Sequence, residues 1–180
     1  MVITDGNPVF NLPGWVKSLS SYIWVIPKPV IYAAIFGVIL VFFTLYTVAG
    51  RNLFALGGNK QSAWYSGINT RKYTLLAHTL SSLLAGVGGI VMLARIGAAE
   101  PTAGDGYETY AIAACIIGGA SLFGGKGKIL GVILGGITIG TINNGLNIMN
   151  VSSFWQKIVM GLLIIGSVAL EKFVSNQAKK

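Results

Sequence analysis

The chain has 180 residues, of which 53% are hydrophobic and only 10% are charged, and its formal net charge is +8. Soluble proteins carry about 25% charged residues, so this composition excludes an ordinary soluble domain and intrinsic disorder. The single cysteine excludes a disulfide scaffold. An integral membrane protein remains, in which the basic excess would set orientation and would not indicate nucleic-acid binding.

Residues 1–29 are predicted not to cross a membrane. Pro8, Pro13, Pro27 and Pro29 interrupt any helix longer than a few turns. The aromatic residues between these prolines are spaced like those that lie at membrane interfaces. We therefore expect this segment to be a loop on one face of the membrane.

Five apolar segments follow, and each is a candidate membrane span. They cover residues 30–49, 73–94, 107–123, 129–149 and 158–170. The uncharged core of the third segment would form only roughly 22 Å of helix, so we expect it to be tilted inside protein, broken or re-entrant. The predicted fold class is all-α: a polytopic membrane helix bundle of about five transmembrane segments within residues 30–172, with a short or broken third segment.

The basic residues indicate the orientation of these segments. Nine of the 13 Lys and Arg residues fall in loops on one side and four on the other, and four of the five acidic residues join those four. The side richer in Lys and Arg is cytoplasmic. The loop 51–72 and the tail 173–180 are therefore expected inside, and the loops 1–29 and 95–106 outside. The chain thus starts outside without an export signal, so we expect it to be the C-terminal part of a longer protein.

The cytoplasmic loop 51–72 contains signals for a short helix. Gly57-Gly58 indicates a turn, Asn59 is a favourable N-cap, and Gly67 is placed as the glycine that ends a helix. A capped helix between two spans can insert into a socket of a partner protein. The alternative interpretation is an ordinary amphipathic connector.

Glycines recur in the third and fourth segments. Residues 112–127 suggest a phosphate-binding loop, but the motif G-x-x-x-x-G-K-[ST] fails at Ala120 and Gly127, so tight helix packing and a flexible cytoplasmic turn are expected instead. Small residues four apart in the fourth segment also indicate a face pressed against another helix. The predicted packing glycines are Gly118, Gly119, Gly131, Gly135, Gly136 and Gly140.

Asparagines cluster near the outer end of the fourth segment. Asn143 and Asn147 are four residues apart and share a helix face, and Asn144 lies beside them. One interpretation is a path for a polar, uncharged solute; the alternatives are interhelical hydrogen bonds or exposure at the interface. His78 is the one ionisable residue expected within a span, which argues against proton coupling and an anionic substrate. No catalytic or metal-binding spacing is visible.

Ordered motifs over residues 30–175 resemble the permease subunits of bacterial ABC importers for monosaccharides, the ribose, xylose and galactoside class. The motifs are Gly50-Arg51-Asn52-x-x-Ala55-x-Gly57-Gly58-Asn59, Ala63-x-x-Ser66-Gly67-Ile68, Arg95-Ile96-Gly97, Ala111-Ile112-Ala113-Ala114, Ile117-Gly118-Gly119-x-Ser121-Leu122-x-Gly124-Gly125, Asn143-Asn144-Gly145-Leu146 and Phe154-Trp155-Gln156. Thr109-Tyr110 stands where Leu-Asp is common in the family, and Lys126 and Lys128 add unusual charge to the glycine turn.

The resemblance implies a subunit of the bacterial inner or plasma membrane that is not an enzyme and binds no cofactor. An ATP-binding cassette subunit would bind ATP, a sugar-binding protein would dock on the outer loops, including 95–106, and a second permease copy would complete a homodimer in the bilayer. The residues implied to couple to the ATPase are Gly57, Gly58, Asn59, Ala63, Ser66, Gly67 and Ile68. Alternative functions are a gradient-driven carrier or channel segment, or a nonfunctional truncated permease copy.

Overall fold

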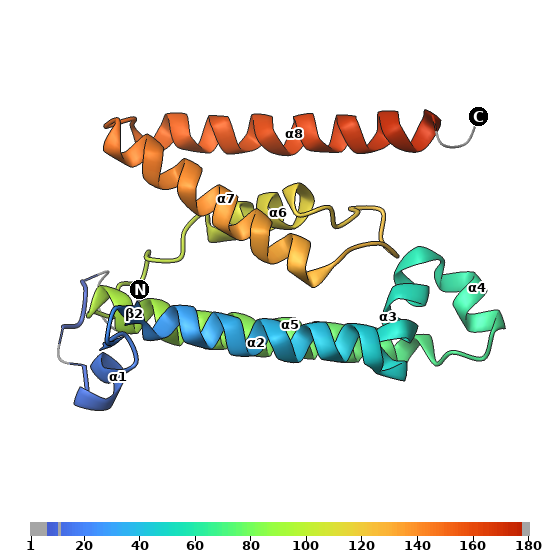
Figure 1. Ribbon diagram of the computed structural model, residues 1–180, viewed down its shortest axis with the longest axis horizontal. Helices are drawn as coiled ribbons and strands as arrows, with labels where there is room; N and C mark the ends of the chain where they lie inside the picture. Colours follow the sequence, from blue (N-terminus) through green and yellow to red (C-terminus); the bar gives the residue numbers. More distant parts are fainter. Residues whose placement is uncertain (1–6, 11, 178–180) are drawn as a thin grey trace. The chain divides into compact units, whose positions relative to one another are not determined.

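The computed structural model describes residues 7–10 and 12–177. They divide into two compact units, one of Met1–Ile39 with Arg71–Asp105 and one of Leu40–Thr70 with Gly106–Lys180. Figure 1 traces the helices in chain order from blue to red. Each unit is described by itself.

Within the described residues, four helices are long and apolar enough to cross a membrane. They are α2 (Lys28–Tyr46), α5 (Thr70–Ile96), α7 (Ile129–Ile148) and α8 (Ser153–Gln177). A shorter apolar helix, α6 (Tyr107–Ile117), occupies the third predicted segment. The predicted fold class, including its short third segment, is confirmed.

The first unit begins with more structure than the predicted loop. It contains the short helix α1 (Gly14–Ser18) and an antiparallel hairpin of β1 (Tyr22–Ile23) and β2 (Ile26–Pro27). Val9 and Ala99 exchange two backbone hydrogen bonds of 3.1 and 2.9 Å, which join this segment to the loop after α5. The prolines keep these elements short, as expected.

The chain bends sharply between α2 and α3 (Val48–Gly58), so the first predicted span ends at Tyr46 and not at residue 49. Thr47 caps α3, because its hydroxyl oxygen accepts a hydrogen bond of 3.0 Å from the Gly50 N–H. A Cβ atom at Gly50 would lie 2.5 Å from the Phe43 carbonyl oxygen. The bend therefore requires glycine at this position.

The turn predicted at Gly57-Gly58 is wrong. α3 continues through both glycines, and the chain turns at Asn59 before α4 (Lys60–Tyr65). The two glycines do not form a turn. They allow the backbone of α3 to lie directly against that of Gly124 and Gly125.

The second unit has a small core where α6 packs against both α7 and α8. Each helix contributes one buried residue to its centre: Ala113, Ile139 and Met160. The helix α8 joins the fifth predicted segment to its flanks and runs on to Gln177. Most of the predicted tail 173–180 is thus helical, and residues 178–180 lie outside the described part.

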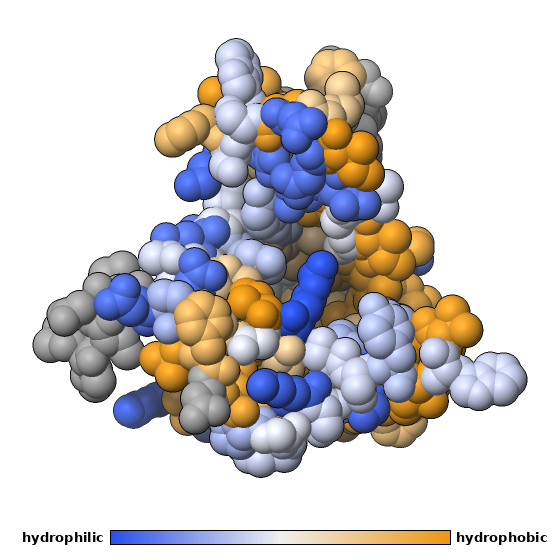
Figure 2. All heavy atoms as spheres, turned by 90° about the vertical axis from the view of Figure 1, so that its left-hand side faces the viewer, coloured by the Kyte–Doolittle hydropathy of each residue, from blue (hydrophilic) through white to orange (hydrophobic). Residues whose placement is uncertain are grey.

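Apolar side chains remain exposed along the long helices. In the most apolar 18-residue window of α5 none of the residues is buried, and in α8 only 12% are. Figure 2 shows orange hydrophobic residues at the surface of the face that it draws. Such surfaces are stable against lipid hydrocarbon, so the chain is a multi-pass membrane protein.

Candidate functional site

The short helix α4 is fixed at its start by Asn59. The Asn59 side-chain oxygen accepts hydrogen bonds from the backbone N–H groups of Gln61 and Ser62, at 3.0 and 2.9 Å. The backbone of Asn59 is extended, as an N-cap requires. The predicted cap is confirmed, and it fixes the angle at which α4 leaves α3.

The end of α4 is fixed as firmly. The N–H of Gly67 donates to Trp64 and that of Ile68 to Ala63, each at 3.0 Å. These two bonds form a Schellman motif, in which the C′ residue is left-handed. Gly67 has a φ of +79°, so the prediction that it ends the helix is confirmed. The Ser66 hydroxyl adds a bond of 2.9 Å to the Ser62 carbonyl oxygen.

Most of α4 faces outward from its own unit. Trp64 is 62% exposed and Tyr65 is 71% exposed, whereas Ala63 is buried and Ile68 is half-buried. Exposed aromatic side chains on a rigid support are typical of protein-binding sites. Lys60, Gln61, Trp64 and Thr70 surround a shallow hollow of about 310 Å³. The helix therefore has the geometry of a docking element.

Two pairs of glycines bring α3 against the turn that follows α6. A Cβ atom added at Gly57 would lie 2.9 Å from the Gly125 nitrogen, and one added at Gly125 would lie 2.5 Å from the Gly58 Cα atom. A Cβ atom at Gly124 would strike the Gly57 carbonyl oxygen. The two backbones are thus in direct contact, which the sequence did not predict.

The predicted packing glycines fall into two groups. Gly118 and Gly131 bring the backbones of α6 and α7 into contact, and a Cβ atom at Gly135 would strike the Ala114 carbonyl oxygen. The positions Gly119, Gly136 and Gly140 meet no atom within 4 Å in the described part of the chain. Both members of the pair Gly131 and Gly135 therefore approach α6 closely, whereas neither Gly136 nor Gly140 does.

The three predicted asparagines occupy different environments. The buried side-chain amide of Gln156, on α8, donates to the Asn147 side-chain oxygen at 2.9 Å and to the Val151 carbonyl oxygen at 2.8 Å. The side-chain oxygen of Asn143 is buried and has no hydrogen-bond partner among the described residues. Asn144 is exposed. Asn147 therefore forms a hydrogen bond with the next helix, whereas the side-chain oxygen of Asn143 is an acceptor without a donor among the described residues.

The sequence places Gln156 in a motif of the family resemblance but assigns it no contact. The signal that could have identified its role is its position, since it is a polar residue in the first turn of a helix whose middle is apolar. A buried amide there needs a partner, and the preceding helix supplies one.

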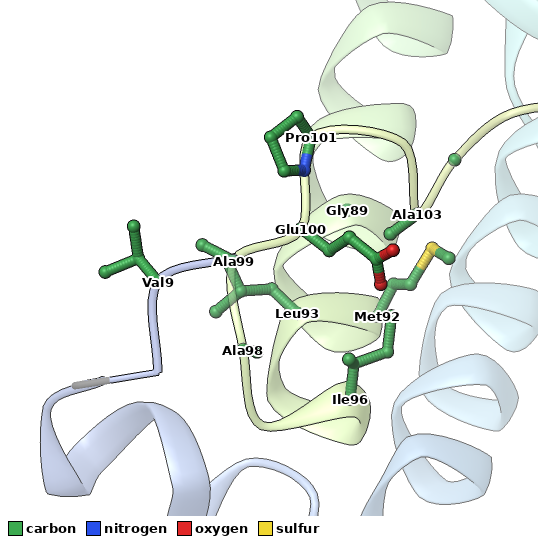
Figure 3. Close-up of a pocket in the computed structure, with 11 residues that line it drawn as sticks. Val9, Gly89, Met92, Leu93, Ile96, Ala98, Ala99, Glu100, Pro101 and Ala103 are labelled. Atoms are coloured by element: carbon green, nitrogen blue, oxygen red, sulfur yellow. The ribbon is translucent and has the colours of Figure 1, made fainter. Parts of the chain in front are cut away.

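A pocket of about 380 Å³ lies in the first unit, between the end of α5 and the loop that follows it. Figure 3 shows Val9 beside Ala99 at one edge of this pocket and Glu100 pointing toward Met92 of α5. The lining is apolar except for Glu100. This loop is the one predicted to face outward.

The residues that the structure describes include no group of three or more His, Cys, Asp or Glu that could hold a metal ion. Cys115 is a half-buried free thiol on α6. The features that stand out are close contacts between apolar helices and the exposed, capped helix α4, and they define a helical, multi-pass membrane protein.

The comparisons with known proteins give the family. A family model described as "Branched-chain amino acid transport system / permease component" matches residues 3–168. The chain belongs to this family of transport permeases. The resemblance inferred from the motifs is confirmed, as is the prediction that the chain is not an enzyme. No solved structure matches the chain.

Curated relatives agree with this assignment. The chain is 51% identical over 176 residues to the D-allose transport system permease protein of Escherichia coli (strain K12), covering 97% of the chain and 54% of that protein. It is 41% identical over 175 residues to the ribose import permease protein of Bacillus subtilis (strain 168), covering 96% and 54%. For the xylose transport system permease protein of Haemophilus influenzae the identity is 40% over 154 residues, covering 86% and 40%. The chain spans about half the length of the curated relatives it matches.

Proposed function

We propose that the chain is part of the transmembrane permease subunit of an ATP-driven importer that carries a neutral monosaccharide, a pentose or a hexose, by alternating access across a bacterial inner or plasma membrane. The observation that carries the proposal is α4, a doubly capped helix with two exposed aromatic residues between two membrane helices. The relatives named for allose, ribose and xylose support the sugar class.

In this proposal α4 docks on an ATP-binding cassette subunit. The ATPase binds and hydrolyses ATP, so the permease needs no cofactor of its own. The face with Trp64 and Tyr65 would fill a socket on the ATPase, and the caps at Asn59 and Gly67 would hold α4 rigid while force is applied. Rigid aromatic residues lose little conformational freedom on binding, which suits a contact that must transmit movement.

The outer loop would receive the sugar-binding protein, and a second permease copy would complete the pathway. The loop after α5 is held by the two backbone bonds between Val9 and Ala99 and presents Glu100. The solute path would use uncharged amides, with the unpaired oxygen of Asn143 as its first candidate contact. A neutral sugar offers hydroxyl donors to such an acceptor.

The test is capture of the ATPase. The chain would be co-expressed with a candidate ATP-binding cassette subunit, and the amount of ATPase purified with it would be compared for Trp64→Ala and Trp15→Ala. The control is matched, because Trp15 is 66% exposed and lies on α1 in the predicted outer segment. We expect Trp64→Ala to reduce capture and Trp15→Ala to leave it unchanged.

The other functions have distinct results. A gradient-driven carrier would take up D-ribose or D-allose in vesicles without ATP or an ATPase. A nonfunctional copy would give no uptake in any combination of partners. Equal capture by the two tryptophan variants would contradict the assignment of α4 as the docking element.

A further inference from the structure

The contact between α3 and the turn after α6 is made by backbone alone. The carbonyl group of Gly57 faces Gly124, and the Cα atom of Gly58 faces Gly125. No side chain lies between the two segments at these positions, so there is no rotamer that can change to absorb a shift. Close-packed contacts of this kind transmit displacement.

The turn itself is braced, in contrast to the flexible turn expected from the sequence. The N–H of Ser121 donates to the Lys126 carbonyl oxygen at 3.0 Å, and the N–H of Gly124 donates to the Ser121 carbonyl oxygen at 3.2 Å. The Ser121 hydroxyl oxygen also accepts a bond of 3.2 Å from the Phe123 N–H. Gly124 and Gly125 have φ values of +86° and +73°, which only glycine adopts readily.

The braced turn leads directly into the packed helices of the same unit. It joins α6 to α7, whose backbones touch at Gly118 and Gly131 and again at Ala114 and Gly135. The helix α6 also packs against α8. A continuous set of backbone contacts therefore runs from the N-cap of α4, beside Gly58, to the helix that carries the asparagines.

We propose that the contact of Gly57 and Gly58 with Gly124 and Gly125 is the mechanical link that carries a displacement of α4 into the α6–α7 pair. The proposal rests on the proposed function, since it takes α4 as the element that the ATPase moves. Gly57, Gly124 and Gly125 are positioning residues: they contact neither ATP nor sugar and act by seating α3 on the turn. If the close contact between α3 and the turn were lost, the ATPase would stay bound and active, but its movement would no longer be transmitted to the α6–α7 pair.

Two variants would disturb the link, and one of them has a matched control. Gly57→Ala places a Cβ atom 2.9 Å from the Gly125 nitrogen. Gly125→Ala and Gly119→Ala impose the same strain, because their φ values are +73° and +80°, but a Cβ atom at Gly119 has open space. Gly119→Ala therefore leaves the proposed link undisturbed.

The test uses the assembled transporter in vesicles, with D-allose and D-ribose as probe sugars. We expect Gly57→Ala and Gly125→Ala to capture the ATPase as the parent does, while ATP hydrolysed per sugar taken up rises at least about fivefold. Gly119→Ala should keep the parent ratio. A merely structural defect would lower capture, hydrolysis and uptake together and leave that ratio unchanged, which would overturn the link. Equal ratios for Gly125→Ala and Gly119→Ala would overturn it as well.

A second measurement does not depend on the glycine variants. Spin labels at Lys60→Cys and Lys126→Cys, both exposed positions of the same unit, report the distance between α4 and the turn. We expect the distance distribution to be the same with and without ATP, because the two segments move as one. A distribution that shifts with ATP would overturn the link and leave the docking role of α4 intact, whereas no ATPase capture by the parent would overturn both.

Discussion

Gln156 and Asn147 join the last two helices through a single side-chain hydrogen bond of 2.9 Å between their amides. The same Gln156 amide nitrogen reaches the Val151 carbonyl oxygen in the turn between these helices. One buried glutamine therefore fixes both the start of α8 and its partner on α7. This hydrogen bond gives Asn147 a structural role. The buried side-chain oxygen of Asn143, in contrast, has no hydrogen-bond partner in the described part of the chain.

Loss of the Gln156 amide should destabilise the protein. Gln156→Leu removes both bonds and leaves two acceptors unpaired, whereas Asn147→Leu leaves the bond to Val151. Hydrogen bonds between membrane helices contribute about 0.6 to 2 kcal/mol each, so Gln156→Leu should lower the free energy of unfolding more than Asn147→Leu. Thermal unfolding in detergent measures the difference. Asn144→Leu, at an exposed amide, is the control and should lower the free energy of unfolding least. Equal decreases at all three positions would contradict the structural role of the Gln156 amide.

Asn143 should matter for transport more than for stability. If its unpaired oxygen accepts a hydrogen bond from the sugar, Asn143→Leu removes an interaction of roughly 0.5–1.5 kcal/mol and slows uptake about 2- to 10-fold. Uptake of D-allose and D-ribose would be compared with that of Asn147→Leu at matched amounts of folded protein. Normal uptake by Asn143→Leu would remove this residue from the solute path.

Removal of the Asn59 cap should weaken both α4 and docking. Asn59→Ala leaves two N–H groups at the start of α4 without their acceptor, at a cost of about 1 kcal/mol. Asn59→Asp keeps an acceptor oxygen at the same place and should retain the cap. We expect ATPase capture to fall for the alanine variant and to persist for the aspartate variant. Capture that falls equally for both would show that the amide itself, and not the cap, is needed.

The parts of the fold that the sequence predicts are those fixed within a few residues. Asn59 and Gly67 act on backbone groups two to five residues away, so their roles in α4 follow from local rules. The apolar lengths of the spans are similarly local. The caps are found where the sequence places them, and the helices overlap the predicted segments but begin or end several residues away from most of the predicted bounds.

Features that depend on distant segments were not predictable in this way. Gly57 and Gly58 look like a turn, and only the approach of the turn at Gly124 and Gly125 shows why a helix ends in two glycines. Helical spacing places Asn143 and Asn147 on one face, but the partner of Asn147 lies on the next helix. Which of the α7 glycines meets α6 likewise depends on the rotation of the helix, which spacing alone leaves open.

The two backbone hydrogen bonds between Val9 and Ala99 should hold the N-terminal segment on the loop that follows α5. Proline lacks the backbone N–H, so Val9→Pro removes the 3.1 Å bond and Ala99→Pro removes the 2.9 Å bond. We expect either variant to speed cleavage of the described N-terminal segment by an added protease in vesicles. Cleavage at the parent rate in both variants would show that other contacts hold the segment.

The glycines of α7 should differ sharply in their tolerance of alanine. At Gly135 an added methyl group would strike the Ala114 carbonyl oxygen, so α6 and α7 would have to move apart; overpacking of this kind costs typically 1–3 kcal/mol. At Gly136, the next residue, the methyl group meets no described atom within 4 Å, and alanine favours helix over glycine by up to about 1 kcal/mol. Thermal unfolding in detergent should therefore show Gly135→Ala destabilised and Gly136→Ala unchanged or slightly more stable. If Gly136→Ala is the more damaging variant, that side of α7 packs against another surface in the assembled protein, and the second permease copy proposed above is the first candidate for it.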